Sequence, residues 1–151
     1  RLALLRPLSL FGNYSFIHAR FDSLDCRGNA QEYAANHFRL TPEHSFTAGL
    51  DARFPLIRGV WLFAVPSLSW QSHVWFEDAN TPGLDQEAYG TLNGHAGVIL
   101  TNPRVTFSVS GTNLLEEKYV ISAGNTGTLF GVPTFIPGPP RMISGKITWR
   151  F

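Results

Sequence analysis

The sequence is poor in charged residues and in cysteine, and it has no long apolar run. Asp, Glu, Lys and Arg make up 15% of its 151 residues, against roughly 25% in an average soluble domain. The net charge of +1 indicates no binding to nucleic acid or to an anionic surface. No stretch of about 18 apolar residues occurs, which excludes a transmembrane helix. Cys26 is the single cysteine, which excludes a disulfide within these residues. We interpret it as a loop thiol or as the partner of a cysteine in another part of the protein.

Residue patterns typical of enzymes and metal centres are also missing. The histidines never recur four residues apart as on a metal-binding helix, and none is paired with a cysteine; they are His18, His37, His44, His73 and His95. One segment is acidic but lacks calcium-loop spacing, so we interpret it as a solvated loop; its acids are Glu77, Asp78, Asp85 and Glu87. No nucleophile elbow or triad pattern occurs. We therefore expect no catalytic residue, no cofactor and no metal ligand, and hence no enzyme.

The sequence is rich in turn formers and aromatic residues, and its dominant period is two. It contains 14 Gly and 10 Pro, and 13% of its residues are aromatic. Apolar and polar residues alternate along several segments, as in strands with two different faces. The expected strands are about 8–21, 44–54, 60–76, 89–101, 104–113 and 139–151. The sequence thus predicts an all-β fold, an antiparallel meander of about six strands.

One expected strand departs from simple alternation. Both faces of 60–76 are apolar up to Pro66. Because proline cannot donate to a ladder, we expect a bulge near Pro66 that exchanges the two faces.

The connections alternate between long and short. The long ones are 22–43, 77–88 and 114–138, and the short ones are 55–59 and 102–103. A soluble sandwich has no physical reason to sort loop lengths onto two ends, whereas an outer-membrane barrel has short periplasmic turns and long extracellular loops. We therefore expect the long loops outside the cell and both ends of the chain on the periplasmic side.

The two faces fit lipid on one side and a wet lumen on the other. We expect an outward, lipid-facing set: Leu50, Ala96, Val98, Phe107, Val109 and Ile147. We expect a lumenal set: Thr47, Asp51, Arg53, Asn93, Ser108 and Lys146. Aromatic residues should form two interfacial girdles, with Phe54, Trp149 and Phe151 at the periplasmic ends of strands and Trp70, Trp75, Phe76 and Tyr89 at the extracellular ends. The competing interpretation is a soluble antiparallel sheet with one wet face.

Six strands do not close a barrel. Single-chain barrels begin at about eight strands, and an open sheet would leave two unpaired edges in lipid. Residues 1–151 are therefore expected to be the C-terminal segment of a larger barrel, unless several copies assemble.

Three stretches resemble the C-terminal third of TonB-dependent outer-membrane receptors. The first is 36–46, Asn-His-Phe-Arg-Leu-Thr-Pro-Glu-His-Ser-Phe, leading into 49–51. The second is 113–119, Asn-Leu-Leu-Glu-Glu-Lys-Tyr, similar to the family's NLFDxxY but with Leu115 in place of Phe and Glu116 in place of Asp. The third is Pro140-Arg141 followed by the close Trp149-Arg150-Phe151. The motif residues of the last two stretches are Asn113, Leu114, Tyr119, Pro140 and Arg141.

The resemblance implies a parent barrel of about 22 strands in the bacterial outer membrane, with a plug domain that is absent from these residues. It implies active uptake of a scarce nutrient, for which a ferric siderophore is our first expectation. The implied partners are the rest of the receptor, the TonB complex through the N-terminal part, membrane lipid and the barrel assembly machinery. The alternatives are a passive porin-like channel or adhesin, and a soluble β-sandwich binding module.

The last strand ends on an aromatic residue. Period two places Ile147, Trp149 and Phe151 on one face. Outer-membrane proteins commonly end in Phe, so the resemblance suggests that these three residues form an assembly signal. The alternative role of Phe151 is that of a girdle aromatic.

Overall fold

The protein is built entirely from antiparallel strands. The computed structural model describes residues 2–5, 7–127 and 132–151. The main sheet consists, in spatial order, of β1 (Leu2–Leu5), β2 (Leu8–Phe16), β3 (His44–Ile57), β4 (Val60–Gln71), β7 (Tyr89–Thr101), β8 (Arg104–Thr112) and β11 (Met142–Trp149). Two small hairpins stand apart from it, β5 (Val74–Trp75) with β6 (Asp85–Gln86), and β9 (Val120–Gly127) with β10 (Val132–Pro137). No helix of the described residues is long and apolar enough to cross a membrane.

The expected meander is confirmed, with four corrections to its strands and connections. The short strand β1, which pairs with β2, was not predicted. Because β1 runs back along β2, residue 2 does not lie at the short-turn end of the sheet, where the N-terminal end of the chain was expected. The strand expected over 60–76 leaves the main sheet at Gln71, and the strand expected over 8–21 ends at Phe16. The long connections contain the β5–β6 and β9–β10 hairpins, where loops were expected. Residues 128–131 of the connection 114–138 lie outside the described residues.

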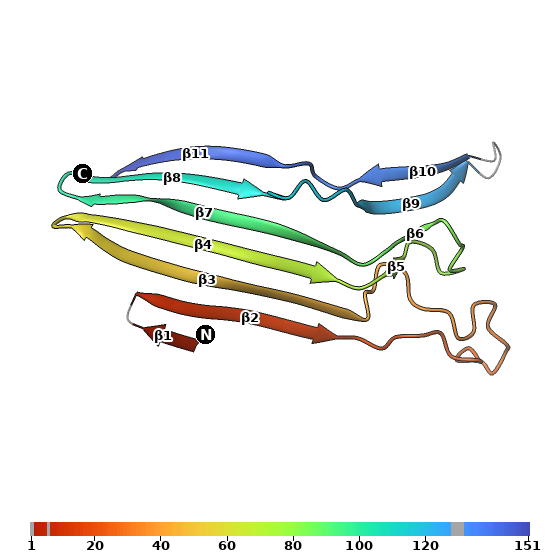
Figure 1. The fold of residues 1–151 in the computed structure, drawn as a ribbon. Coiled ribbons are helices and arrows are strands. Elements are labelled where there is room, and N and C mark those ends of the chain that lie inside the picture. Colours follow the sequence, from red (N-terminus) through yellow and green to blue (C-terminus); the bar gives the residue numbers. More distant parts are fainter. Residues whose placement is uncertain (1, 6, 128–131) are drawn as a thin grey trace.

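Long and short connections lie at opposite ends of the sheet, as expected. In Figure 1 the short turns are on the left with the C-terminus, and every long connection is on the right. β3 runs on to Ile57, so the first short turn contains only residues 58 and 59. Gly59 has φ +81° there, and its carbonyl accepts a 2.9 Å hydrogen bond from the amide of Thr101, the last residue of β7. A glycine is favoured at that position because it adopts positive φ without steric cost.

The register confirms the two predicted sets of residues on opposite faces. Leu50 is paired with Leu10, and Val98 with Phe107, which is in turn paired with Ile147. Successive side chains alternate between faces, and directly paired residues share one. The apolar face comprises Leu10, Ala48, Leu50, Phe54, Leu62, Leu68, Ala96, Val98, Phe107, Val109 and Ile147. The polar face comprises Ser9, Asn13, Thr47, Asp51, Arg53, Ser69, Asn93, Ser108 and Lys146.

The expected exchange of faces at Pro66 is wrong. β4 and β7 keep one register from Val60↔Leu100 through Pro66↔Gly94 to Gln71↔Tyr89. Trp61, Phe63 and Val65 therefore stay on the polar face. Phe63 is accommodated there because its ring lies over Gly97, which is directly opposite it.

An aromatic ring also lies over a glycine elsewhere on the polar face: Phe11 is paired with Gly49 and covers it. A Cβ at either glycine would collide with the aromatic ring. The two phenylalanines on this face are thus accommodated by the glycines opposite them, and the β4–β7 register contains no bulge near Pro66.

The aromatic girdles are only partly as predicted. Trp70 stacks on Phe46 at 5.5 Å between ring centroids on the apolar face, near the long-loop end. Tyr89 belongs instead to the polar face, and Phe76 is buried outside the main sheet. Trp75 lies in β5, also outside it. At the turn end, Phe54, Trp149 and Phe151 are exposed, as a girdle requires.

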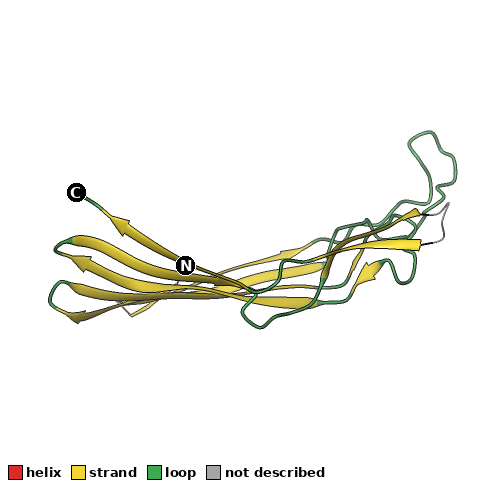
Figure 2. Ribbon diagram, turned by 90° about the horizontal axis from the view of Figure 1, so that it is seen from above, coloured by secondary structure: helices red, strands yellow, loops and turns green. Residues whose placement is uncertain are grey.

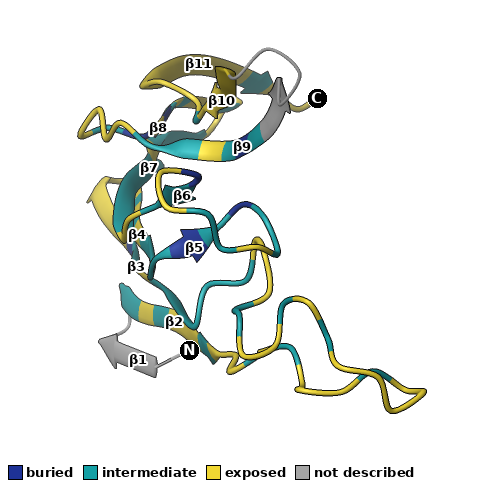
Figure 3. Ribbon diagram, turned by 90° about the vertical axis from the view of Figure 1, so that its right-hand side faces the viewer, coloured by how far each residue is buried: buried dark blue, intermediate teal, exposed yellow. Residues whose placement is uncertain are grey.

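The main sheet is a single curved layer. Figure 2 shows one layer of strands with loops gathered at one end, and Figure 3 shows the strands following an arc from β11 to β2. The buried hydrophobic cluster consists of Val74, Phe76, Leu84 and Ala123, all from the long connections. Within the described chain β11 pairs only with β8, so one long edge of the sheet is open.

Candidate functional site

The described residues of the long connections form one structured unit, which we call the loop layer: residues 17–43, residues 72–88, and residues 113–127 with 132–141 as its third segment. The first segment is tied to the second by backbone and amide groups. The His37 amide donates to Asn80 Oδ1 at 2.7 Å, and Asn80 Nδ2 donates to the His37 carbonyl at 3.0 Å. The Leu40 amide donates to the Trp75 carbonyl at 2.8 Å.

The second segment is tied to the third. The Val120 amide donates to Gln86 Oε1 at 2.7 Å. Phe76 and Leu84 pack with Ala123 in the buried cluster, with Val120 against it. Apolar burial and hydrogen bonds thus join the three segments.

The surroundings lower the pKa values of three ionisable groups in the first segment. Hydrogen bonds to the carboxylate, led by that of the Asn29 amide, lower the pKa of Asp25. A hydrogen bond from His18, at 3.0 Å, lowers the pKa of Glu43. Burial lowers the pKa of His37, which keeps that ring neutral at neutral pH. The two lowered carboxyl pKa values contribute stability at neutral pH, which is lost as the pH falls through them.

The motif residue Asn113 acts as a clamp at the base of the loop layer. It is 3% exposed. Its Nδ2 donates to the Glu117 carbonyl at 2.9 Å and to the Pro139 carbonyl at 3.1 Å, and its Oδ1 accepts from the Glu117 amide at 2.9 Å. Its φ is +49°, a conformation that asparagine tolerates better than most residues. One side chain therefore shapes the turn after β8 and holds the start of β11 beside it.

Two other motif residues fill space left by glycines. Leu114 covers Gly94 and Gly111, which are paired across β7 and β8. Tyr119 covers Gly138 and stacks on Tyr89 at 4.2 Å between ring centroids.

The remaining motif residues line a cleft. Arg141 is ion-paired with Glu116 at 2.8 Å. A cleft of about 570 Å³ lies here, lined by Tyr119, Pro140 and Arg141 among others. The motif stretches 113–119 and 140–141, separated in sequence, are therefore neighbours in space.

A second, more polar hollow lies on the polar face near the long-loop end. Its volume is about 210 Å³, and its lining includes Asn13, Thr47, Ser69, Gln71, Tyr89, Thr91 and Tyr119. Thr47 and Ser69 are hydrogen-bonded through their hydroxyl groups at 3.1 Å. Hydroxyl, amide and aromatic groups at one place suit a polar ligand with flat apolar portions.

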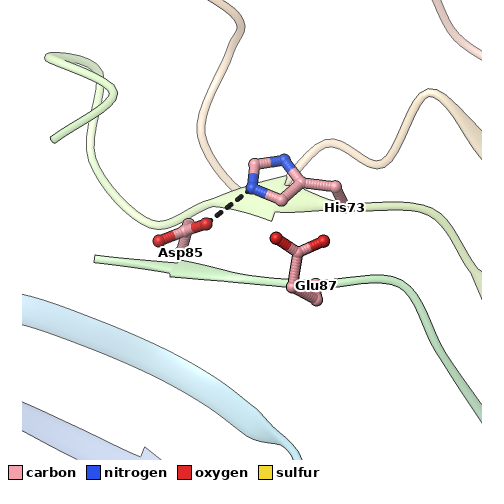
Figure 4. Close-up of side chains that lie close together, drawn as sticks. All are labelled: His73, Asp85 and Glu87. Carbon is pink, nitrogen blue, oxygen red and sulfur yellow. Dashed lines mark hydrogen bonds and ion pairs between the residues drawn. The ribbon is translucent and has the colours of Figure 1, made fainter. Parts of the chain in front are cut away.

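The loop layer also brings together a possible set of metal ligands. His73, Asp85 and Glu87 offer ligand atoms that all lie within 4.8 Å of one another (Figure 4). His73 Nε2 is 2.7 Å from Asp85 Oδ2. The sequence search missed this set because it tested helical and calcium-loop spacings, whereas these residues meet across a hairpin.

No family model and no curated protein sequence matches the chain. Among solved structures, it is similar to the ferric yersiniabactin uptake receptor of Yersinia pestis, with a TM-score of 0.79 and 19% sequence identity. The match covers 96% of this chain and 21% of that receptor. The chain has the fold of a segment of an uptake-receptor barrel. The predicted fold class and the resemblance to TonB-dependent receptors are thus confirmed in the fold, and the match is to a transport protein.

The last strand, β11, presents exposed apolar side chains on one face of the sheet. Ile147 and Trp149 lie on the apolar face, 70% and 63% exposed. The rings of Trp149 and Phe151 are 5.1 Å apart. These residues therefore present an apolar, partly aromatic strip at the turn end of the sheet, beside the open edge of β11.

The orientation of such a barrel is testable with two exposed arginines at opposite ends of the sheet. Arg27 lies in the loop layer and Arg58 in the turn between β3 and β4. In a Cys26→Ser background, Arg27→Cys should react with a membrane-impermeant maleimide on intact cells, and Arg58→Cys should react only after the outer membrane is permeabilised. The opposite reactivity would invert the topology.

Proposed function

We propose that the chain is the C-terminal barrel segment of a TonB-dependent outer-membrane receptor that actively takes up a ferric siderophore. The observation that carries the proposal is the match of nearly the whole chain to the barrel of a ferric-chelate receptor. The chain spans 21% of that receptor's length. In this proposal the remaining strands and the plug are supplied by the rest of the same protein.

The unpaired edge of β11 supports the proposal that the rest of the same protein supplies the remaining strands. An unpaired β11 edge in lipid would cost several kcal/mol for each exposed backbone group, so a further strand is needed beside it. The apolar face would contact lipid and the polar face would line the lumen. In this proposal the plug and the TonB complex provide gating and energy.

The loop layer and the polar hollow support the receptor role. In a barrel of this orientation the loop layer lies outside the cell and the polar hollow opens just below it. A chelate captured by the loops would reach the hydroxyl, amide and tyrosine groups of that hollow first. The stacked Tyr89 and Tyr119 would offer flat apolar area to an aromatic siderophore.

Uptake of radioactive iron tests the proposal. Cells that depend on the full-length protein should accumulate iron from a ferric siderophore, and accumulation should stop when TonB is removed while surface binding persists. Uptake that continues without TonB would identify a passive porin-like channel. If the cells neither bind nor take up any of a panel of ferric chelates, the protein is an adhesin or another structural barrel and the proposal is wrong.

We also propose that Ile147, Trp149 and Phe151 act as the assembly signal for the barrel assembly machinery. Deleting Phe151 from the full-length protein should slow insertion and leave periplasmic precursor, while assembled barrels remain nearly as heat-stable as the wild type. The physical reason is that an unpaired strand edge with a terminal aromatic suits strand addition. Pulse-chase labelling measures the insertion rate. An unchanged rate with lowered stability would show that Phe151 is only a girdle aromatic.

A further inference from the structure

His73, Asp85 and Glu87 meet because of the register of the β5–β6 hairpin. Val74 is paired with Gln86 and Trp75 with Asp85. Continuing this register by one residue places His73 opposite Glu87. Alternation then puts His73, Asp85 and Glu87 on one face of the hairpin, while Val74 takes the other face and enters the buried cluster. Figure 4 shows the three side chains gathered on the hairpin.

We propose that these three side chains form a binding site for a divalent transition-metal ion of the Zn²⁺ type. The site is separate from the transported cargo and does not depend on the proposed uptake function. One imidazole nitrogen and two carboxylates are ligands that Zn²⁺ and similar ions accept, whereas Ca²⁺ and Mg²⁺ prefer oxygen ligands alone. Three protein ligands leave a fourth position for water or for a group brought by another molecule.

The distances suit such an ion. Zn–N and Zn–O bonds of about 2.0–2.2 Å in a tetrahedron place ligand atoms roughly 3.4 Å apart. The observed separations run from 2.7 Å between His73 and Asp85 up to 4.8 Å for the whole set. An ion would therefore part the His73–Asp85 pair by less than an ångström and draw in Glu87, whose exposed side chain is free to turn.

Neighbouring groups orient two of the three ligands. The Gly83 amide donates to Asp85 Oδ1 at 3.0 Å, which directs Oδ2 toward His73. The rings of Trp75 and His73 are nearly perpendicular to each other, with their centroids 4.8 Å apart. Such contacts restrict a ligand's orientation before the ion arrives, and thus reduce the entropy lost on binding.

Binding here would stiffen the whole loop layer. The ion would crosslink the strands of the β5–β6 hairpin next to Trp75 and Gln86. Trp75 accepts a hydrogen bond from Leu40 of the first segment, and Gln86 accepts one from Val120 of the third. The metal would thereby restrain the two neighbouring segments through existing contacts.

The test is zinc titration of the full-length protein, purified in detergent and stripped with a chelator, against a chromophoric zinc indicator. The wild type should bind one zinc ion that His73→Ala and Asp85→Asn weaken by more than about 100-fold, beyond the 10–100-fold effect of outer-shell changes. Glu87→Gln should weaken binding by at least about tenfold, because it removes one of three ligands. Co²⁺ in place of Zn²⁺ should give visible absorption bands of inner-sphere coordination, which His73→Ala abolishes.

His18→Ala is the matched control. It removes a histidine that is hydrogen-bonded to a carboxylate, Glu43, at 3.0 Å, but with no third ligand nearby among the described residues. Zinc affinity should be unchanged in this variant. Equal zinc binding by the wild type and Glu87→Gln, or no stoichiometric binding at all, would overturn the proposal. Because Glu87 is exposed, its variant reports on the site even if His73→Ala fails to fold. The titration involves no transport, so a failed uptake assay would not affect its outcome.

Discussion

In the full-length protein, Phe107→Arg should lower the free energy of unfolding by about 2–4 kcal/mol, as arginine at the lipid face of a barrel near mid-membrane does. Phe107 lies at the middle of β8 on the apolar face, between Val98 and Ile147 on the neighbouring strands. An arginine there would be placed in hydrocarbon with no counter-charge beside it. Reversible urea unfolding in lipid bilayers measures the effect.

The adjacent residue is the internal control. Ser108 is on the polar face between Gly97 and Lys146, so Ser108→Arg should cost far less, mainly through repulsion by Lys146. Ser110→Arg, whose neighbours are His95 and Ser144, repeats the control without that like charge. If all three arginines destabilise equally, the assignment of the apolar face to lipid is wrong.

Asn113→Ala should lower the free energy of unfolding by about 4 kcal/mol or more. It removes three side-chain hydrogen bonds at a buried position, and each buried group left unsatisfied costs about 1–3 kcal/mol. Alanine is also disfavoured at φ +49°, by roughly 1–2 kcal/mol. The same unfolding experiment measures this change.

Two further variants separate the causes at this position. Asn113→Gly loses the same hydrogen bonds without the backbone strain, and should be about 1 kcal/mol more stable than Asn113→Ala. Asn36→Ala removes a single hydrogen bond, from Nδ2 to the Asp78 carbonyl, and should cost only about 1 kcal/mol. An Asn113→Ala variant no weaker than Asn36→Ala would show that the clamp contributes little.

The strands and their faces were predictable because period two is a local signal. Residues 104–112 alternate so regularly that the faces of Val105, Phe107 and Val109 follow from sequence alone, and the register confirms them. The placement of long and short connections at opposite ends of the sheet was also predictable, because it follows from their lengths in the sequence. The motif 113–119 was recognisable by resemblance, but the bonds from Asn113 to Glu117 and Pro139 that explain it were not.

What could not be predicted depends on which residues are opposite one another. Apolar residues on both faces near Pro66 suggested a bulge. Only the register shows that Phe63 is opposite Gly97, which leaves room for its ring without one. The set of His73, Asp85 and Glu87 was hidden for the same reason. The sequence nevertheless contains the information needed to find this set. The β5–β6 pairs continue the register of the β4–β7 pairs, so that Gln71↔Tyr89 leads on to Trp75↔Asp85. Extending the predicted hairpin outward would have brought the three ligands together.

The Asn113 clamp also bears on the order in which the sheet is built. β8 and β11 are neighbours in the main sheet, but residues 113–141 separate them, and this is the longest connection between two paired strands of that sheet. Closing a flexible loop costs about 0.6 kcal/mol for each doubling of its length. The bond from Asn113 to Pro139 joins the two ends of that loop. Once it forms, β11 needs to search only a few residues of chain to find its place, so its pairing becomes almost as local as that of a hairpin. The clamp is therefore expected to set the rate at which the final strand is added, and a weakened clamp should delay that step even in molecules that eventually reach the same structure.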